Sequence, residues 1–411
     1  MISIDEALRR VLLQVPDSRT EVVELQFSEG RVLAEDVVSD LDIPPFHRSA
    51  MDGFAVRSKD VRQVPVKLEC VGEVPAGSIS PIELKPGQVV SIMTGAPVPA
   101  GADSVVRVED TSRENGGKTV RFEVSVPEGM NIEPQGRITK VGHVVLPAGT
   151  CMVPAAVGVA AMVGRSQVRV FARPRVAFVS TGDELVEIDR VPEPGQIRNS
   201  NRYTIESMAR CAGAEVVWSR LLPDDLEVTR ATLREAIGHI DVLLFSGGVS
   251  MGEYDFVHRA MHAENVEMQF EKVAVKPGKP LSFGRAGTTM VFGLPGNPVS
   301  SFITFLLFVG PTLRKMSGRK DIPLVTVRAR LESEKPLRGS NRVQYLPARL
   351  ESTGEEGWVV HPLPWAGSAD LCRLVDVDGF LEVPIQEESI ESGCSVRVIV
   401  SKHLIGGGLD A

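Results

Sequence analysis

The chain has 411 residues, which is too long for one ordinary hydrophobic core, so we expect about two to four domains. Its formal net charge of −8 argues against a protein that coats nucleic acid through overall charge, so any anion site must be built locally. A hydrophobic fraction of 43% with 24% charged residues is typical of globular proteins.

The N-terminal stretch does not resemble a targeting signal. MISIDEALRRVLLQV carries acids before its apolar residues and lacks the basic start of a signal peptide. No apolar run reaches the roughly 20 residues of a membrane span. The cysteines are scattered and form no Cys-x-x-Cys pair, which is typical of free thiols in a reducing compartment. We therefore expect a cytoplasmic protein with neither a membrane nor a nucleic-acid partner.

The first part of the chain predicts two intertwined segments. Residues 1–41 predict a helix over ISIDEALRRVLLQV and then a strand-like stretch. Residues 42–140 are rich in Pro and Gly and carry short β-branched runs, which favours a small all-β module. Residues 141–171 predict strand, helix, strand. They continue the first segment if the β module is an insertion.

The second part of the chain changes character. In residues 172–321 apolar strands alternate with amphipathic helices, which predicts a doubly wound parallel sheet. Residues 322–411 return to short alternating strands, which predicts a small β barrel, with a sandwich as the alternative. The expected fold class is therefore α/β plus β, in four subdomains.

Four predicted strands end in unusual loops that should share one edge of the sheet, where parallel-sheet proteins bind ligands. The loops are TGDE after VAFVS, PDD after VVWSRLL, SGGVS after DVLLF, and PGNPVS after MVFGL. Backbone N–H groups in such loops attract phosphate, whereas carboxylates repel phosphate unless a metal lies between them. Mg²⁺ suits such a site because it uses one or two carboxylates, water and phosphate oxygens.

Local cations come from the segment EKVAVKPGKP, which holds Lys272, Lys276 and Lys279. Each feature alone has a plain structural explanation: the Gly-Gly pair as a turn, Asp224 as a helix cap, and the lysines as a solvated turn. Their coincidence at one sheet edge favours a ligand site. We expect a phosphate held by backbone, with Asp255 reaching it through Mg²⁺.

Seven motifs in order resemble one known family. They are SAMDGFAV (49–56), IMTGAPVP (92–99), STGDEL (180–185), NSN (199–201), SGGVSMGE (246–253), KPGKP (276–280) and LPGNPVS (294–300). This set resembles the molybdopterin molybdenumtransferases, MoeA, and the E domain of gephyrin, and the resemblance runs from about residue 3 to residue 402.

The resemblance implies a homodimer with four subdomains per chain and a Mg²⁺-dependent reaction. Molybdopterin-adenylate and molybdate would be the substrates, molybdenum would enter the dithiolene, and AMP would leave. The α/β subdomain resembles the molybdopterin adenylyltransferase, which is a candidate partner.

The resemblance also implies site residues. Glu184 and Asp255 would bind Mg²⁺. Gly247, Gly248 and Ser250 would bind the nucleotide phosphate. The implied catalytic residues are Asp52, Thr94, Asp224, Lys272 and Lys276. The implied molybdate-side residues are Lys276, Lys279, Ser300, Arg342 and Ser368.

One position departs from the family pattern. Gly136 is followed by Arg137 and Ile138, where the family usually has an acidic pair. We expect Ile138 to be a buried structural residue. Two alternatives remain open at this stage: a nucleotide-binding homologue that has lost molybdenum insertion, and a scaffold of the gephyrin kind.

Overall fold

The computed structural model describes residues 1–78, 81–248, 255–320, 322, 324–354, 357–386 and 388–401. The chain divides into two compact units. The α/β unit comprises Met1–Val23, Ser28–Ala34 and Arg169–Ala411, and the β unit comprises Glu24–Phe27 and Glu35–Val168. Within the described residues, no helix combines the length and apolar character needed to cross a membrane.

The β unit is built on the predicted short strands. Its main sheet has the order β7 (Ser104–Arg107), β4 (Gly53–Val56), β6 (Gln88–Ile92), β5 (Val66–Val74), β9 (Thr119–Phe122) and β8 (Thr111–Glu114). Phe54 and Phe122 meet edge-to-face in its core, with ring centroids 6.0 Å apart. Away from this sheet, β11 (Val144–Leu146) pairs with β2 (Val37–Val38), and α2 covers Pro154–Met162. Strand β11, which follows the main sheet in the chain, therefore pairs with β2, which precedes it.

The first helix forms where the sequence predicts it. Helix α1 (Ile4–Leu13) begins after Ser3, whose side chain accepts a hydrogen bond from the Glu6 N–H. Ala7 and Val11 lie one turn apart and are fully buried. These side chains join the core of the α/β unit.

The central sheet of the α/β unit has the order β16 (Glu215–Leu222), β13 (Arg175–Thr181), β17 (Val242–Ser246), β21 (Thr289–Leu294), β20 (Ser282–Ala286) and β18 (Glu267–Phe270). The first four strands run parallel, as predicted. The last two strands pair antiparallel. The sheet is therefore mixed, because a short turn at Gly287 joins β20 directly to β21 without a crossover helix.

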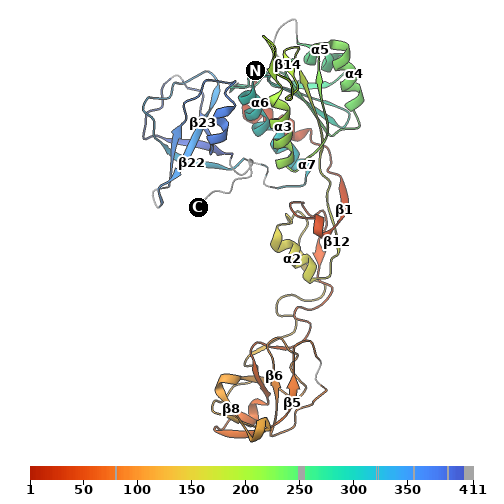
Figure 1. Ribbon diagram of the computed structural model, residues 1–411, viewed down its shortest axis with the longest axis vertical. Coiled ribbons are helices and arrows are strands. Elements are labelled where there is room, and N and C mark those ends of the chain that lie inside the picture. The colour runs from red at the N-terminus through yellow and green to blue at the C-terminus, as the bar shows by residue number, and fades with distance from the viewer. Residues whose placement is uncertain are drawn as a thin grey trace. The chain divides into compact units, whose positions relative to one another are not determined.

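Helices cover both faces of this sheet (Figure 1). Val176 and Phe178 of β13 face the core that contains α3 (Ser200–Cys211), α6 (Pro298–Thr304) and α7 (Gly310–Met316). The alternate residues Ala177 and Val179 face the core of α4 (Leu226–Ala236) and α5 (Phe256–Ala263). Since β13, β17 and β21 are buried on both faces, these strands are largely apolar, which is why they are easily found in the sequence.

The helix predicted over PVSSFITFLLFVGPTLRKM is interrupted. A π-helical stretch, η5 (Phe305–Val309), lies between α6 and α7. Pro311 stands in the first turn of α7, where a missing N–H costs least. The interruption therefore accommodates a proline inside one long buried helical segment.

The C-terminal strands close into a barrel. The strands are β22 (Thr326–Leu331), β23 (Val343–Ser352), β24 (Trp358–Pro362), β25 (Gly379–Val383) and β26 (Ser395–Val400). Strand β23 pairs with both β24 and β25, and β22 pairs with both β24 and β26. Pairing of β25 with β26 completes the ring, so the barrel prediction is confirmed and the sandwich alternative is not. Strand β19 (Val275–Lys276) adds to β23 outside the ring.

Candidate functional site

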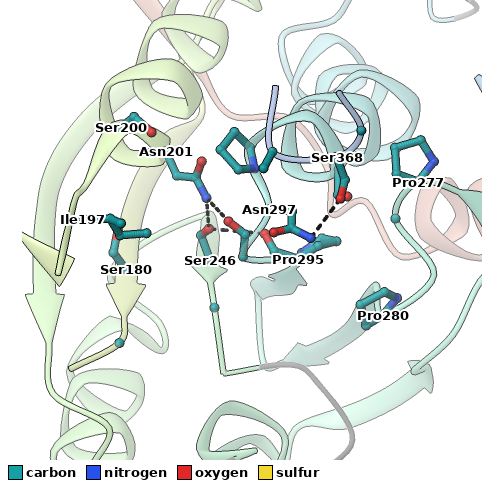
Figure 2. Close-up of a pocket in the computed structure, with 18 of the residues that line it drawn as sticks. Ser180, Ile197, Ser200, Asn201, Ser246, Pro277, Pro280, Pro295, Asn297 and Ser368 are labelled. Atoms are coloured by element: carbon teal, nitrogen blue, oxygen red, sulfur yellow. Dashed lines mark hydrogen bonds between the residues drawn. The ribbon is translucent and has the colours of Figure 1, made fainter. Parts of the chain in front are cut away.

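The four parallel strands end together at one edge of the sheet, as predicted. Their registers align Thr181 with Leu222, Ser180 with Ser246, and Ser246 with Leu294. A cavity of about 1110 Å³ opens at this edge, between the strand ends and residues of the C-terminal barrel (Figure 2). Nine predicted site residues line it: Glu184, Asp224, Gly247, Gly248, Lys276, Lys279, Ser300, Arg342 and Ser368.

The Gly-Gly pair after β17 forms a turn that only glycine fits. Gly247 has φ +96°, and a Cβ there would lie 2.4 Å from the Thr181 carbonyl oxygen. Gly248 has φ +62°, and its Cβ would lie 2.8 Å from Thr181 Oγ1. The backbone of the turn therefore packs directly on the end of β13 and forms part of the cavity wall.

Carboxylates gather on one wall of the cavity. Glu184 and Asp224 both line it, and the Asp224 N–H donates to Asp183 Oδ1 at 3.1 Å. Burial raises the pKa of Asp224, and the negative charges of Asp183 and Glu184 raise it further. A cation bound here would offset this repulsion.

A cationic group lies on another wall. Lys276 and Lys279 flank the Pro277–Gly278 turn, and both lysines line the cavity. Pairing of β19 with β23 sets Val275 opposite Val343, which brings Arg342 of the barrel beside this turn. Its Nη1 donates to the Val275 carbonyl at 3.3 Å. Three cationic side chains from two subdomains therefore meet at one cavity.

Hydroxyl and amide groups complete that wall. Ser300 and Ser368 line the cavity, and the Ser368 carbonyl accepts from the Val299 N–H at 3.0 Å. Asn297 Nδ2 donates to Ser368 Oγ at 3.0 Å (Figure 2). Cations beside hydroxyl and amide donors suit a tetrahedral dianion.

Two asparagines of the NSN motif, Asn199 and Asn201, also line the cavity. We did not predict them as site residues. Asn201 Nδ2 donates to Ser246 Oγ at 2.8 Å and to the Gly296 carbonyl at 2.7 Å. This tie joins the loops after β17 and β21 (Figure 2). The NSN motif could have indicated these asparagines as site residues. The spacing of a motif does not reveal, however, which group each side-chain amide contacts.

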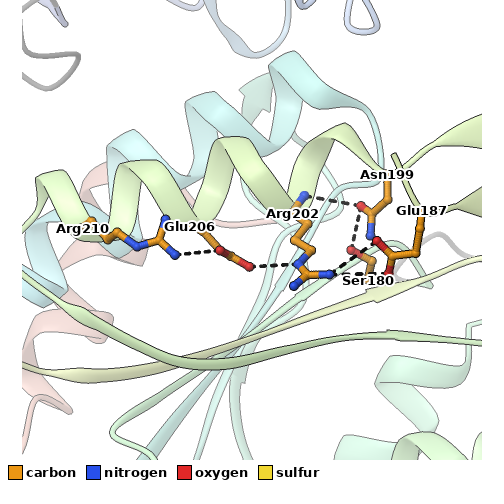
Figure 3. A network of polar contacts seen from close by, with 6 residues as sticks. All are labelled: Ser180, Glu187, Asn199, Arg202, Glu206 and Arg210. Carbon is orange, nitrogen blue, oxygen red and sulfur yellow. Dashed lines mark hydrogen bonds and ion pairs between the residues drawn. The ribbon is translucent and has the colours of Figure 1, made fainter. Parts of the chain in front are cut away.

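A polar network includes Asn199 (Figure 3). Asn199 Oδ1 accepts from Ser180 Oγ at 3.0 Å, and Arg202 pairs with Glu206 at 3.1 Å. Glu206 also pairs with Arg210 at 2.8 Å. The Ser180–Asn199 bond joins the start of α3 to the end of β13, and both of these residues line the cavity. The two ion pairs lie within α3 and stabilise the helix itself.

Several predicted residues lie elsewhere. Lys272 does not line the cavity, and its carbonyl accepts from the Ile2 N–H at 3.3 Å. Ser250 lies outside the described residues. Asp255 is not an exposed loop acid, as its sequence context suggested, but is only 8% exposed. Its carboxylate caps α5 through the His258 N–H and also contacts His258 Nδ1, so in this structure it serves the helix.

Asp52 and Thr94 form a pair in the β unit. Antiparallel pairing of β4 with β6 sets Gly53 opposite Ile92, so Asp52, just before β4, lies beside Thr94, just after β6. Asp52 Oδ1 accepts from the Thr94 N–H at 2.6 Å and from Thr94 Oγ1 at 2.9 Å. These bonds lower the pKa of Asp52, the backbone bond more than the hydroxyl bond.

Replacing Thr94 by valine should raise the pKa of Asp52 part of the way towards its ordinary value of 3.8, because the hydroxyl donor is lost while the N–H remains. A carboxyl-carbon NMR titration measures this pKa directly. Thr94→Ser, which keeps the hydroxyl, is the control. Equal Asp52 pKa values in the two variants would show that the hydroxyl does not stabilise the carboxylate.

Ile138 is not buried as expected: 58% of its surface is exposed. Only its backbone is engaged, through an N–H bond to the Ile43 carbonyl at 2.8 Å. Ile138→Asp should therefore change the free energy of unfolding by less than about 0.5 kcal/mol, as exposed substitutions do. Turnover should not rise, since Glu184 and Asp224 already supply two carboxylates at the cavity. Thermal unfolding and turnover assays test both points, and a faster variant would show that the family's acid is needed.

The carboxylate wall fits a Mg²⁺ ion. Among the described residues, no group of three or more His, Cys, Asp or Glu side chains is arranged to hold a metal. Mg²⁺ requires fewer, since one or two carboxylates suffice when phosphate and water complete its shell. Glu184 and Asp224 both line the cavity, and burial, followed by the charges of Asp183 and Glu184, raises the pKa of Asp224. These two residues are the carboxylates that would hold the ion.

Comparisons with known proteins agree across the whole chain. Residues 2–164 match the MoeA N-terminal region (domain I and II), residues 177–315 a probable molybdopterin binding domain, and residues 328–401 the MoeA C-terminal region (domain IV). The Bacillus subtilis protein named molybdopterin molybdenumtransferase is 34% identical over 408 residues, covering 98% of this chain and 94% of its own. The Nostoc protein of the same name is 36% identical over 393 residues, covering 92% and 88%.

A solved structure is also similar over nearly the full length. The molybdopterin biosynthesis MoeA protein of Pyrococcus horikoshii has a TM-score of 0.83 and 31% identity, and the match covers 97% of this chain and 99% of that one. The recognition made from the sequence motifs is confirmed, as is the predicted fold class. The chain therefore belongs to the MoeA family of molybdopterin molybdenumtransferases.

Proposed function

We propose that this protein is a molybdopterin molybdenumtransferase, a transferase of molybdenum cofactor biosynthesis. It takes molybdopterin-adenylate and molybdate, inserts molybdenum at the dithiolene and releases AMP. One observation carries this proposal: a single cavity combines a glycine turn and a carboxylate wall with a cluster of cations and hydroxyl groups. The glycine turn and the carboxylates suit a metal-bound phosphate, and the cations and hydroxyl groups suit molybdate.

Different groups of cavity residues bind the phosphate of the substrate and neutralise charge. The backbone at Gly247 and Gly248 holds the phosphate end of the adenylylated substrate. Lys276, Lys279 and Arg342 neutralise molybdate and the charge that develops when the phosphate bond breaks. No protein nucleophile is required, since a molybdate oxygen can attack the AMP phosphorus and break the phosphoanhydride bond to the molybdopterin phosphate. That oxygen then leaves with AMP when the dithiolene sulfurs replace it on molybdenum. The protein therefore acts by binding, orientation and charge neutralisation.

Mg²⁺, held by Glu184 and Asp224, would neutralise phosphate charge during AMP release. Asp255 was predicted as the second ligand; its role as a cap of α5 makes Asp224, which lines the cavity, the better candidate. The pair Asp52 and Thr94 of the β unit is proposed to act in the same reaction, on the strength of the family motifs that contain it.

Removal of Mg²⁺ by a chelator should abolish AMP release, and Glu184→Gln should raise the Mg²⁺ concentration for half-maximal rate by about tenfold or more. Glu187→Gln is the matched control, because Glu187 is a nearby carboxylate that pairs with Arg202 at 3.5 Å and does not line the cavity. Magnesium titrations of the AMP-release rate provide the measurement. Equal Mg²⁺ requirements in the two variants would remove Glu184 from the metal site.

We also propose that the protein acts as a homodimer in the cytoplasm and receives its substrate from a molybdopterin adenylyltransferase. The five cysteines are scattered along the sequence without a Cys-x-x-Cys pair, which supports a reducing compartment. Light scattering of the purified protein tests the dimer, and a mass of a single chain at micromolar concentration would contradict it. Molybdate-dependent AMP release from molybdopterin-adenylate tests the activity itself.

A further inference from the structure

Asn297 occupies a position where asparagine ordinarily caps a helix, but it does not do so here. It is the residue before the first turn of α6, and its side chain makes no hydrogen bond to that helix. A side-chain cap stabilises a helix, so an asparagine at this position that makes no cap leaves that stabilisation unused. Departures of this kind are concentrated at functional positions.

The Asn297 amide reaches a different part of the chain instead. Its Nδ2 donates to Ser368 Oγ at 3.0 Å, across 71 positions of sequence. A second bond closes the same contact, from the Val299 N–H to the Ser368 carbonyl at 3.0 Å. The segment around Ser368 is thus fixed to the start of α6 by one side-chain bond and one backbone bond (Figure 2).

The direction of the side-chain bond determines what the serine hydroxyl can do. A hydroxyl has one proton to donate and two lone pairs that accept. Because Ser368 Oγ accepts from Asn297, its proton remains available for another acceptor. Ser368 and Asn297 both line the cavity that contains Lys276, Lys279 and Arg342, where an anion would be the acceptor.

We propose that Asn297 is a positioning residue that makes Ser368 a donor to the oxyanion held by the cationic wall. This inference rests on the proposed function, in which that oxyanion is molybdate. Asn297 acts through Ser368, and its contribution should therefore depend on the serine hydroxyl. Its effect should be larger on the oxyanion than on AMP, since its side-chain bond goes to Ser368 and not to the Gly247–Gly248 turn.

Four variants of the full chain test the inference: Asn297→Ala, Asn297→Asp, Ser368→Ala and the double variant Asn297→Asp with Ser368→Ala. Asn297→Ala should weaken molybdate binding about three- to tenfold, the usual effect of losing one hydrogen bond. Asn297→Asp should weaken it more, because a carboxylate accepts the serine proton and turns the hydroxyl away from the anion. Calorimetry with molybdate and, separately, with AMP gives both affinities, and the AMP affinity should change less than twofold.

The double variant separates hydroxyl orientation from simple charge repulsion. If Asn297 acts through the hydroxyl, Asn297→Asp should have a clearly smaller effect in the Ser368→Ala background than in the unaltered protein. Equal effects in both backgrounds would overturn the inference, because they would mean that the added charge alone repels the anion. Asn115→Asp is the matched control, since Asn115 Nδ2 donates to the Thr119 hydroxyl at 3.2 Å in the β unit and does not line the cavity.

The outcomes also distinguish the inference from the proposed function. If molybdate binds the unaltered protein and Ser368→Ala weakens it, while both Asn297 variants bind normally, the inference alone is overturned. If the unaltered protein shows no molybdate binding, both fail. A loss of AMP affinity in the Asn297 variants equal to the loss of molybdate affinity would also overturn the inference, since it would indicate a collapsed cavity.

Discussion

Lys276→Gln should lower kcat/KM for molybdate by about 10²- to 10³-fold, the loss expected when a preorganised charge at the reacting groups is removed. Lys276 is the last residue of β19 and lines the cavity. Strand β19 pairs with β23 of the barrel, which begins directly after Arg342. Lys279 lies on the other side of the Pro277–Gly278 turn and lines the same cavity, so the proposed function has both lysines acting on one anion. Glutamine keeps most of the volume of the side chain but carries no charge.

Steady-state assays of AMP release at varied molybdate concentration measure this effect. Lys276→Arg, which keeps the charge but changes its geometry, should recover part of the lost rate. Lys59→Gln, a change of an exposed lysine in the β unit, is the control for the loss of one positive charge. A Lys276→Gln enzyme with kcat/KM within twofold of the unaltered protein would contradict the assignment of the cationic wall.

Gly247→Ala should be strongly destabilising and should abolish phosphate binding. The added Cβ would lie 2.4 Å from the Thr181 carbonyl oxygen and 3.1 Å from Thr181 Oγ1, so the turn must move away from the end of β13. The positive φ of +96° adds backbone strain. Together these effects should cost about 1–3 kcal/mol in the free energy of unfolding. AMP affinity should fall because the N–H groups of the turn shift.

A second glycine isolates the steric part of this effect. Gly238 has φ +81°, but a Cβ there would have no heavy atom within 4 Å. Gly238→Ala therefore carries the backbone strain without the collision and should leave AMP affinity unchanged. Chemical denaturation and calorimetry with AMP compare the two variants. Equal unfolding free energies would mean that the turn relaxes around the added methyl group.

The sequence predicts the strand ends well because the parallel strands are buried on both faces. Their apolar runs have clear limits, and each limit coincides with a loop that lines the cavity, as with Ser246 at the end of β17. Strand direction is harder to predict. The antiparallel pairing of β20 and β21 depends on a direct turn at Gly287, and a short apolar run looks the same in either direction.

The site itself was only partly predictable, for reasons that differ from residue to residue. Arg342 and Ser368 reach the cavity through contacts with β19 and α6, which no local pattern reveals. Asp255 carries the same signal whether it binds metal or caps a helix, and here it caps α5. Ile138 was predicted to be buried because it is apolar, but an apolar side chain at the surface is common and carries no information about burial.

The central claim is that one cavity brings molybdate and the adenylylated substrate together, so that AMP leaves only when molybdenum enters. The direct measurement incubates the purified protein with molybdopterin-adenylate and Mg²⁺, with and without molybdate, and quantifies the AMP released and the molybdenum cofactor formed. The account predicts negligible AMP release without molybdate and one AMP per molybdenum inserted with it. AMP release at the same rate without molybdate, or release without formation of the molybdenum cofactor, would contradict it.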